Sequence, residues 1–353
     1  MKAAADYSAL DEALEILEPY AAEYRGGLTN HGPMAVEALC ALGRSDAVIP
    51  WVDRYRKALD PRPTPHERIL ASDWRNTLGR ESRVADWMAF FENEMQEQPW
   101  QDVLKAWVPR LASGIIAAAT HGPIRVGHGA RGIAAKDTPQ RRKELADGLG
   151  YWAATFSFLP GSGGTHPAKA GAMPSEAILK LQIIPPEHRG NFGLISQALS
   201  QLDTFAPFAR TLDMVDTSGD ASRFLSDLTA TFARIYLANA KSVLGAIVFV
   251  HSVTGPSSLR PMLPYLSPDV TAGALSYAWQ AAAALFTVYG FKTAPEEDSA
   301  SRSFDREGLI ARAIDSGDEH AIKFTEVCLR EYALTPRPEY LAAAHHASGV
   351  LRR

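Results

Sequence analysis

Apolar residues recur at intervals of three and four along most of this chain, and that helical periodicity limits the possible folds more than any other feature. Residues 8–19, for example, place Leu10, Leu14 and Leu17 on one helix face. Residues 32–43 repeat the pattern and end at Gly43, a residue type that often follows the last helical turn. The same pattern predicts helices over seven further ranges: 82–96, 100–119, 139–158, 222–254, 271–290, 305–315 and 318–332.

No segment combines alternating β-branched residues with the turn residues of a hairpin. The predicted fold class is therefore all-α, and 353 residues are enough for one large domain or two ordinary ones. We expect a single compact multi-helix domain over residues 1–353, with a long connection near residues 159–200. Flexible segments are expected at residues 159–175, which include a glycine-rich run, and in a C-terminal tail at 336–353.

The composition argues against several classes of protein. A formal net charge of −4 provides no basic surface for nucleic acid or an anionic membrane. Two cysteines, Cys40 and Cys328, do not suggest a disulfide framework and cannot supply a zinc-ribbon ligand set. The first residues lack the apolar core of a signal peptide, and the apolar stretches at 244–250 and 272–289 are better explained as buried helices. We therefore expect a cytoplasmic protein with neither nucleic-acid nor membrane partners.

Sequence motifs for the common cofactors are absent. The run Gly161-Ser162-Gly163-Gly164 fails the dinucleotide fingerprint, because position 166 is histidine and no strand precedes the run. The sequence also lacks a Walker motif, a His-Glu-x-x-His pair and a Gly-x-Ser-x-Gly elbow. If the protein carries out redox chemistry, a metal ion is the simplest source of it.

The ten histidines divide by their local context. His121 and His251 each follow an apolar run and are expected to be buried near helix ends. Burying an unpaired imidazole costs about 1–3 kcal/mol, so each of these rings needs a core hydrogen bond or a metal. Five histidines lie among polar or loop residues, where a solvated surface role is the ordinary expectation: His66, His166, His188, His345 and His346.

Two further histidines stand at predicted helix starts. His31 opens a helix after Asn30, and its ordinary role would be in a turn or cap, with Asn30 as the better capping residue. His320 shares a helix face with Lys323, three residues later, and an exposed position is its ordinary alternative. The four separated histidines at 31, 121, 251 and 320 would form one site only if the fold brought them together.

Several segments together resemble the questin oxidase-like family, in a consistent order between residues 24 and 330. The segments are residues 29–34, 73–79, 86–92, 121–129, 145–153, 251–254 and 320–323, with Trp100, Leu111 and Gly114 between them. The family includes enzymes of fungal secondary metabolism that open anthraquinone rings oxidatively. The resemblance implies an oxygenase that uses O₂ on an aromatic polyketide, and an all-α fold with a buried metal site.

The resemblance also implies a mononuclear non-haem Fe(2+) held by His31, His121, His251, His320 and a carboxylated lysine. That lysine corresponds to Lys323, with Lys241 as a weaker substitute. Neutral imidazoles suit iron(II). A lysine ammonium has no lone pair for a metal, whereas the carbamate formed with CO₂ is an anionic oxygen ligand. The alternative for Lys323 is a solvated lysine paired with a neighbouring glutamate.

Candidate catalytic residues follow from the same segments. Arg125 is expected to stabilise a phenolate or orient the ring, with a structural salt bridge as the alternative. His128 is a candidate acid or base near neutral pH, although the family pattern suggests an aromatic residue at this position, which leaves the substrate open. Three aromatic residues are candidates to line a pocket for a flat substrate, with core packing as the alternative: Trp74, Tyr151 and Trp152.

Two other functions remain open from the sequence. One is a Baeyer–Villiger-type oxidase on the same substrate class with NADPH as an external reductant. The other is a non-catalytic helical scaffold whose histidines belong to the core. The expected partners under the oxygenase hypothesis are a small aromatic molecule and O₂, and the expected assembly is a monomer or homodimer.

Overall fold

Helices dominate the structure, a computed structural model that describes residues 5–161, 171–294 and 304–352. Within those ranges the only strands are two strands of two residues each: β1 (Glu23–Tyr24) pairs antiparallel with β2 (Leu28–Thr29). The all-α prediction is confirmed. The chain separates into two compact units, the first made of Met1–Ser157 and Ser258–Ser267, the second of Phe158–Ser257 and Pro268–Arg353. The expectation of one domain over residues 1–353 stays a prediction.

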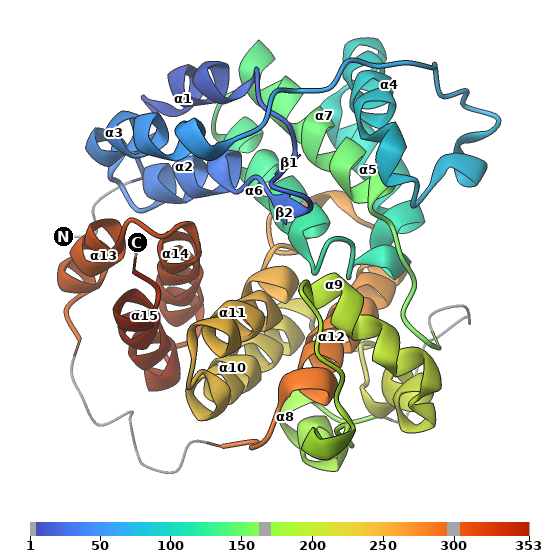
Figure 1. The fold of residues 1–353 in the computed structure, drawn as a ribbon, viewed down its shortest axis with the longest axis vertical. Coiled ribbons are helices and arrows are strands. Elements are labelled where there is room, and N and C mark those ends of the chain that lie inside the picture. The colour runs from blue at the N-terminus through green and yellow to red at the C-terminus, as the bar shows by residue number, and fades with distance from the viewer. Residues whose placement is uncertain (1–4, 162–170, 295–303, 353) are drawn as a thin grey trace. The chain divides into compact units, whose positions relative to one another are not determined.

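The first unit packs its helices around two central ones, α6 and α7 (Figure 1). Helix α7 lies against α4 and α6, while α2 packs on α6 and is covered by α1 and α3. The α-helices are α1 (Leu10–Leu17), α2 (Gly32–Ala41), α3 (Ser45–Tyr55), α4 (Val84–Glu97), α5 (Trp100–Leu111), α6 (His121–Ala135) and α7 (Pro139–Ala154). The short 3-10 helices are η1 (Arg56–Ala58), η2 (Trp74–Thr77), η3 (Glu81–Arg83), η4 (Ala112–Gly114) and η9 (Leu263–Tyr265).

Glycines allow these helices to approach closely. A Cβ added to Gly150 of α7 would lie 2.7 Å from the backbone nitrogen of Met88 in α4. A Cβ added to Gly122 of α6 would lie 2.9 Å from Cα of Trp152 in α7. Real Cβ atoms do not tolerate such distances, so these glycines fix the separation between the helix backbones.

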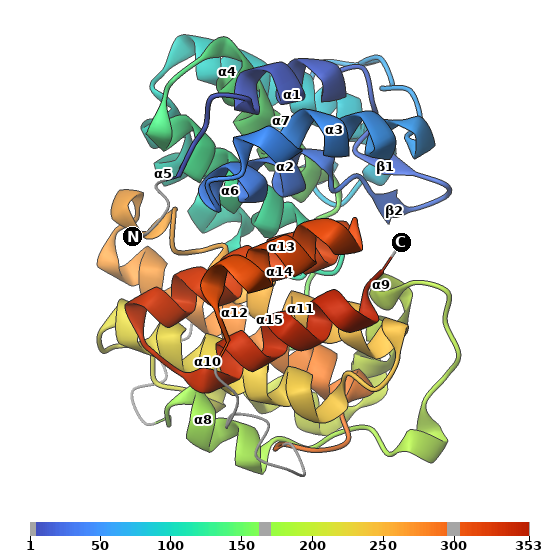
Figure 2. The same cartoon turned by 90° about the vertical axis from the view of Figure 1, so that its left-hand side faces the viewer.

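The second unit is a bundle of long helices. Helix α11 packs between α10 and α12, and α13, α14 and α15 lie side by side (Figure 2). The α-helices are α8 (Pro174–Ala177), α9 (Ile195–Ala198), α10 (Ala221–Asn239), α11 (Val243–Ser257), α12 (Pro268–Tyr289), α13 (Arg306–Ser316), α14 (Glu319–Leu334) and α15 (Pro338–Val350). The 3-10 helices are η5 (Ile178–Lys180), η6 (Pro186–His188), η7 (Leu199–Thr204) and η8 (Ala206–Met214).

A two-residue turn fixes where α14 begins. Gly317 ends α13 in the left-handed conformation, with φ of 70°. Asp318 follows as the N-cap of α14, and its carboxylate accepts hydrogen bonds from the backbone N–H groups of His320 and Ala321. Gly317 and the Asp318 cap therefore fix the first turn of α14, which carries His320.

Several predicted helix boundaries were wrong. The range 222–254 contains two helices, because the backbone leaves the helical region at Ala240, beside an Asn239 side chain that bonds the backbone at Lys292. The predicted helix 100–119 stops at Leu111, and the next three residues form the 3-10 helix η4. Helices α3 and α6 went unpredicted, the latter because its glycines, which suit close packing against α7, weaken its helical pattern.

The segments expected to be flexible have different outcomes. Residues 162–170, which make up most of the range 159–175, lie outside the described residues. The expected C-terminal tail at 336–353 contains α15, which packs against α14 and α10, so a helix stands where a flexible tail was expected. In the described part of the chain, no helix has the length and apolar character that crossing a bilayer requires.

We predict that Gly150→Ala destabilises the protein by about 2 kcal/mol or more, because the added methyl meets the backbone of α4, which cannot move aside as a flexible side chain would. Urea unfolding would measure the change. Gly273→Ala is the matched control: it also lies within a helix, α12, but a Cβ there meets nothing within 4 Å. The control should gain roughly 0.5–1 kcal/mol from helix propensity. Equal effects at both positions would contradict the packing argument.

Candidate metal site

His31 stands at the entrance to α2. It is the N-cap residue of that helix, yet its side chain makes no capping bond. Asn30 takes over part of that task, since its Oδ1 accepts a hydrogen bond from the backbone N–H of Gly32. The backbone N–H of His31 donates to the hydroxyl of Tyr55 over 2.7 Å. These contacts fix the backbone of His31, and its ring is buried.

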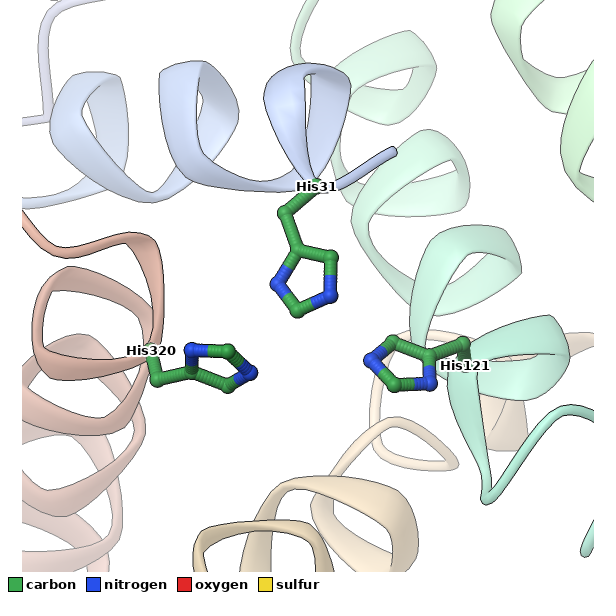
Figure 3. Close-up of side chains that lie close together, drawn as sticks. All are labelled: His31, His121 and His320. Carbon is green, nitrogen blue, oxygen red and sulfur yellow. The ribbon is translucent and has the colours of Figure 1, made fainter. Parts of the chain in front are cut away.

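His121 is the first residue of α6, and its ring lies beside that of His31 (Figure 3). The two ring centroids are 4.6 Å apart and the planes are inclined by 51°. Both side chains are buried. Two residues 90 positions apart in the chain therefore form a histidine pair within the first unit.

An unusual backbone turn leads into His121. Ala118, Ala119 and Thr120 have φ values of 47°, 55° and 75°, so three successive residues with side chains adopt the left-handed conformation. Each such residue costs roughly 1–2 kcal/mol relative to the right-handed form. Clusters of strained residues of this kind occur where a site requires a particular geometry.

The left-handed turn supplies a partner for the His121 ring. Nδ1 of His121 lies 2.5 Å from the carbonyl oxygen of Ala118. A carbonyl can only accept a hydrogen bond, so Nδ1 must carry a proton, and in the neutral ring Nε2 then keeps its lone pair. Metal-binding histidines commonly donate their other ring N–H to a backbone carbonyl in this way, so the contact is compatible with a ligand role for Nε2.

The second unit contains an equivalent histidine. Nδ1 of His251, in α11, lies 2.6 Å from the carbonyl oxygen of Ile247, one helical turn earlier. The same reasoning leaves Nε2 of His251 with its lone pair. The His251 ring is 5.4 Å from that of His320, at an interplanar angle of 81°. A second pair of buried histidines thus lies within this unit.

Two carboxylates surround His320 at the start of α14. Nδ1 of His320 lies 3.3 Å from Oδ1 of Asp318 and 3.9 Å from Oε1 of Glu319. Burial raises the pKa of Asp318, but the hydrogen bond and charge of His320 outweigh it and lower that pKa to about 2. Asp318 therefore stays ionised, and its negative charge favours the tautomer of His320 that carries the proton on Nδ1.

Lys323 lies one turn after His320 on α14 and is fully buried, with 1% of its surface exposed. Burial lowers the pKa of its amine to about 8, against the opposing charges of Glu319 and Asp318. The solvated alternative for this residue is therefore wrong. A neutral amine, the form that reacts with CO₂, is within reach at neutral pH, whereas Lys241 is exposed.

The candidate catalytic residues are engaged in ion pairs. Arg125 binds Glu144 through two parallel hydrogen bonds of 2.7 Å, both partners being buried. Nδ1 of His128 lies 2.6 Å from a carboxylate oxygen of Glu37, which also binds Arg131. The salt bridge that was the alternative for Arg125 is thus present, and the catalytic roles of Arg125 and His128 stay predictions.

The three aromatic candidates are buried in the first unit. Trp74 packs edge-on against Trp107, with centroids 5.1 Å apart. The indole of Trp152 donates to the carbonyl oxygen of Gly114, and the hydroxyl of Tyr151 bonds both Thr29 and Glu23. These contacts fit core packing, and their role in binding a substrate stays a prediction.

The remaining histidines differ from the two buried pairs. His66 and His188 are exposed, and His345 and His346 are half-buried on α15. His166 lies outside the described residues. The sequence reasoning missed Asp318 and the left-handed turn at residues 118–120. The Asp318-x-His320 spacing at a helix start was a usable signal for the first, whereas a run of alanines gives no signal for positive φ.

Residues 28–134 match the questin oxidase-like family. The resemblance inferred from the sequence is thereby confirmed over that part of the chain. The family name denotes an oxidase, so the match indicates oxidoreductase chemistry. No curated protein matches the chain.

The questin oxidase-like segment contains the first histidine pair, His31 and His121, together with the left-handed turn. It does not reach His251, His320 or Lys323. The family match therefore bears only on the first histidine pair.

We predict that Ala119→Gly raises the free energy of unfolding of the metal-free protein by about 0.5–1 kcal/mol. Glycine adopts positive φ without the strain of a Cβ, which outweighs its greater loss of entropy on folding. Ala117→Gly is the matched control, since Ala117 is buried in the same segment without positive φ and should lose stability. Thermal unfolding of both variants would measure the difference. A loss of stability in both would show that the turn is unstrained.

We predict that Lys323→Met stabilises the metal-free protein by roughly 3 kcal/mol at pH 7 in CO₂-free buffer. The folded pKa of about 8 lies below the ordinary value of 10.5, so the unfolded chain binds more protons between these pH values. Stability of the wild type therefore rises with pH across that window, and the advantage of the variant disappears towards pH 10.5.

Denaturant unfolding from pH 7 to pH 10.5 would measure this convergence. Lys241→Met is the control, because Lys241 is exposed and its replacement should change stability by less than about 0.5 kcal/mol at every pH. A constant difference between Lys323→Met and the wild type over the whole range would contradict the prediction.

Proposed function

We propose that this protein is a non-haem iron oxygenase that opens the ring of an aromatic polyketide, with an anthraquinone-like molecule as the substrate class. The proposed iron ligands are His31, His121, His251, His320 and Lys323 in its carboxylated form. The family match over residues 28–134 supports the oxidase chemistry.

The observation that carries the proposal is the fixed tautomer of His121 and His251. Both rings donate Nδ1–H to a backbone carbonyl, at 2.5 Å and 2.6 Å, which leaves both Nε2 atoms as electron-pair donors. A histidine with only a core role needs a hydrogen bond from either nitrogen, whereas a ligand that binds through Nε2 needs the proton on Nδ1, which both carbonyl contacts favour. A borderline metal such as iron(II) suits a set of neutral imidazoles.

The charge of the proposed donor set also fits iron. Four neutral imidazoles would leave the full +2 charge of the ion in a buried environment, which is costly. Carboxylation turns the amine of Lys323 into an anion and lowers that charge. Burial favours the neutral amine that this reaction needs, as the lowered pKa of Lys323 indicates.

Bound iron would supply the activation of O₂. The chain itself would hold the metal ligands in position and exclude water from the site. The buried surroundings of all four histidines keep bulk water away from the reacting atoms. The N-cap bonds of Asp318 and the hydrogen bond from His31 to Tyr55 hold the ligands' backbones in place before any metal arrives.

The two alternatives make different predictions from the same sample. An NADPH-dependent Baeyer–Villiger-type oxidase would consume NADPH in proportion to product, whereas a ring-opening oxygenase would consume O₂ alone. A scaffold protein would keep its stability and its composition after loss of either histidine pair. No observation on the structure favours either alternative over the iron oxygenase.

We predict that the protein purified from iron-supplied cells contains about one iron per chain, and that His121→Ala lowers the iron content at least tenfold. The reason is that the variant removes a proposed ligand whose Nδ1 contacts the Ala118 carbonyl, an arrangement that favours metal binding through Nε2. Elemental analysis by mass spectrometry would measure the iron. His188→Ala is the matched control, because His188 is exposed on η6 and should keep the wild-type iron content.

The same samples separate the proposal from the scaffold alternative. Iron that is absent from the wild type, together with unchanged thermal stability of His121→Ala, would contradict the oxygenase. Iron that is lost equally in His121→Ala and His188→Ala would point to adventitious surface binding instead.

A further inference from the structure

Thr120 occupies the N-cap position of α6 without acting as a cap. Threonine is common at such positions because its hydroxyl accepts a hydrogen bond from the backbone N–H two or three residues later. Here the side chain makes no capping bond, since φ of 75° turns the residue into the left-handed conformation. The usual structural reason for a threonine at this position is therefore missing.

Threonine is also a poor choice for this backbone. A β-branched residue at positive φ is a true outlier, and glycine or asparagine would adopt the same turn at lower cost. The two preceding residues are alanines, which limit the strain to a single methyl each. Thr120 is thus the most strained residue of the turn, and it carries the turn's only polar side chain.

The hydroxyl of Thr120 is buried without a partner in the protein. The residue is 1% exposed, and among the described residues no hydrogen-bond donor or acceptor engages its Oγ1. The carbonyl of Ala118, in the same turn, already accepts hydrogen bonds from the ring and from the backbone N–H of His121. A buried hydroxyl without a partner costs free energy, and a valine of the same shape would avoid that cost.

The position of Thr120 suggests what the hydroxyl serves. The next residue is His121, whose ring lies 4.6 Å from that of His31. Thr120 thus combines backbone strain with a buried hydroxyl that lacks a partner among the described residues, at the position that directly precedes one member of a buried histidine pair. Such costs persist where a ligand uses them.

We propose that the Thr120 hydroxyl donates a hydrogen bond to an acceptor atom, most simply an oxygen, of a ligand bound at the His31–His121 pair. This inference rests on the proposed function, because it takes the pair to be part of a metal site. Two sources supply that chemistry: a small oxygen ligand on the metal, and the phenolate oxygen of the substrate. The hydroxyl then acts on the ligand and leaves the metal to the imidazoles.

The test uses the full chain loaded with cobalt(II), which is stable in air and has a spectrum sensitive to its ligands. Thr120→Val removes the hydroxyl and keeps the shape, and Thr120→Ser keeps the hydroxyl. Optical titrations with azide and with phenol would measure binding of a small anion and of an aromatic oxygen. Thermal unfolding of the metal-free variants gives a readout independent of the metal.

Thr120→Val should weaken binding of at least one probe about tenfold, whereas Thr120→Ser should stay within about threefold of the wild type. The affected probe identifies the ligand as the small anion or as the aromatic oxygen. Metal-free Thr120→Val should unfold at a temperature equal to or above that of the wild type, because it loses no hydrogen bond.

Other outcomes overturn the inference in distinguishable ways. If cobalt binds and both probes bind Thr120→Val as they bind the wild type, or bind neither protein, the hydroxyl does not serve a ligand and the proposed function survives. If Thr120→Val unfolds at a clearly lower temperature while Thr120→Ser does not, the hydroxyl holds a structural partner such as a buried water. If the wild type binds no cobalt, the inference and the proposed function fail together.

Discussion

The hydrogen bond from Nδ1 of His121 to the carbonyl of Ala118 links a strained backbone turn to the tautomer of a buried histidine. The bond exists only because residues 118–120 turn in the left-handed sense and bring that carbonyl under the ring. The folding free energy lost in the turn is recovered elsewhere, in helices whose glycines allow close packing, such as Gly122 against Trp152. The strained conformation therefore persists because the packing of the surrounding helices holds it in place.

The second unit reaches the same tautomer without strain. Nδ1 of His251 bonds a carbonyl one turn earlier in a regular helix, and Nδ1 of His320 lies 3.3 Å from the carboxylate that also caps α14. Three different local environments therefore favour a proton on Nδ1: a strained turn, a helical carbonyl and the charge of an N-cap residue. Independent routes to one chemical outcome are better evidence for a ligand role than burial alone, because a core histidine needs only some hydrogen bond, from either nitrogen.

The sequence predicted the fold class and the burial of His121 and His251, since both depend on local periodicity and apolar runs. Its resemblance to a family singled out His31 and His320, which local context alone would have left in a turn and on an exposed face. It could not predict the left-handed turn, because Ala117 to Ala119 are strong helix formers and only the tertiary structure overrides that propensity. The burial of Lys323 was equally hidden, since a lysine between Glu319 and Glu326 has the pattern of a solvated helix face.

The buried polar groups of this chain fall into two kinds, and the difference bears on function. In the first kind, oppositely charged side chains bind one another, which offsets much of the free energy that burying each charge would cost. Examples are the pair Arg125–Glu144 and the group formed by Glu37, His128 and Arg131. Lys323 and Thr120 are different, because burial lowers the pKa of the first and the second has a hydroxyl that the protein does not use. Selection for stability alone would remove both by substitutions as simple as methionine and valine. Thr120 directly precedes His121, and Lys323 follows His320 by three residues, so both costly groups lie close in sequence to a histidine of one of the two buried pairs.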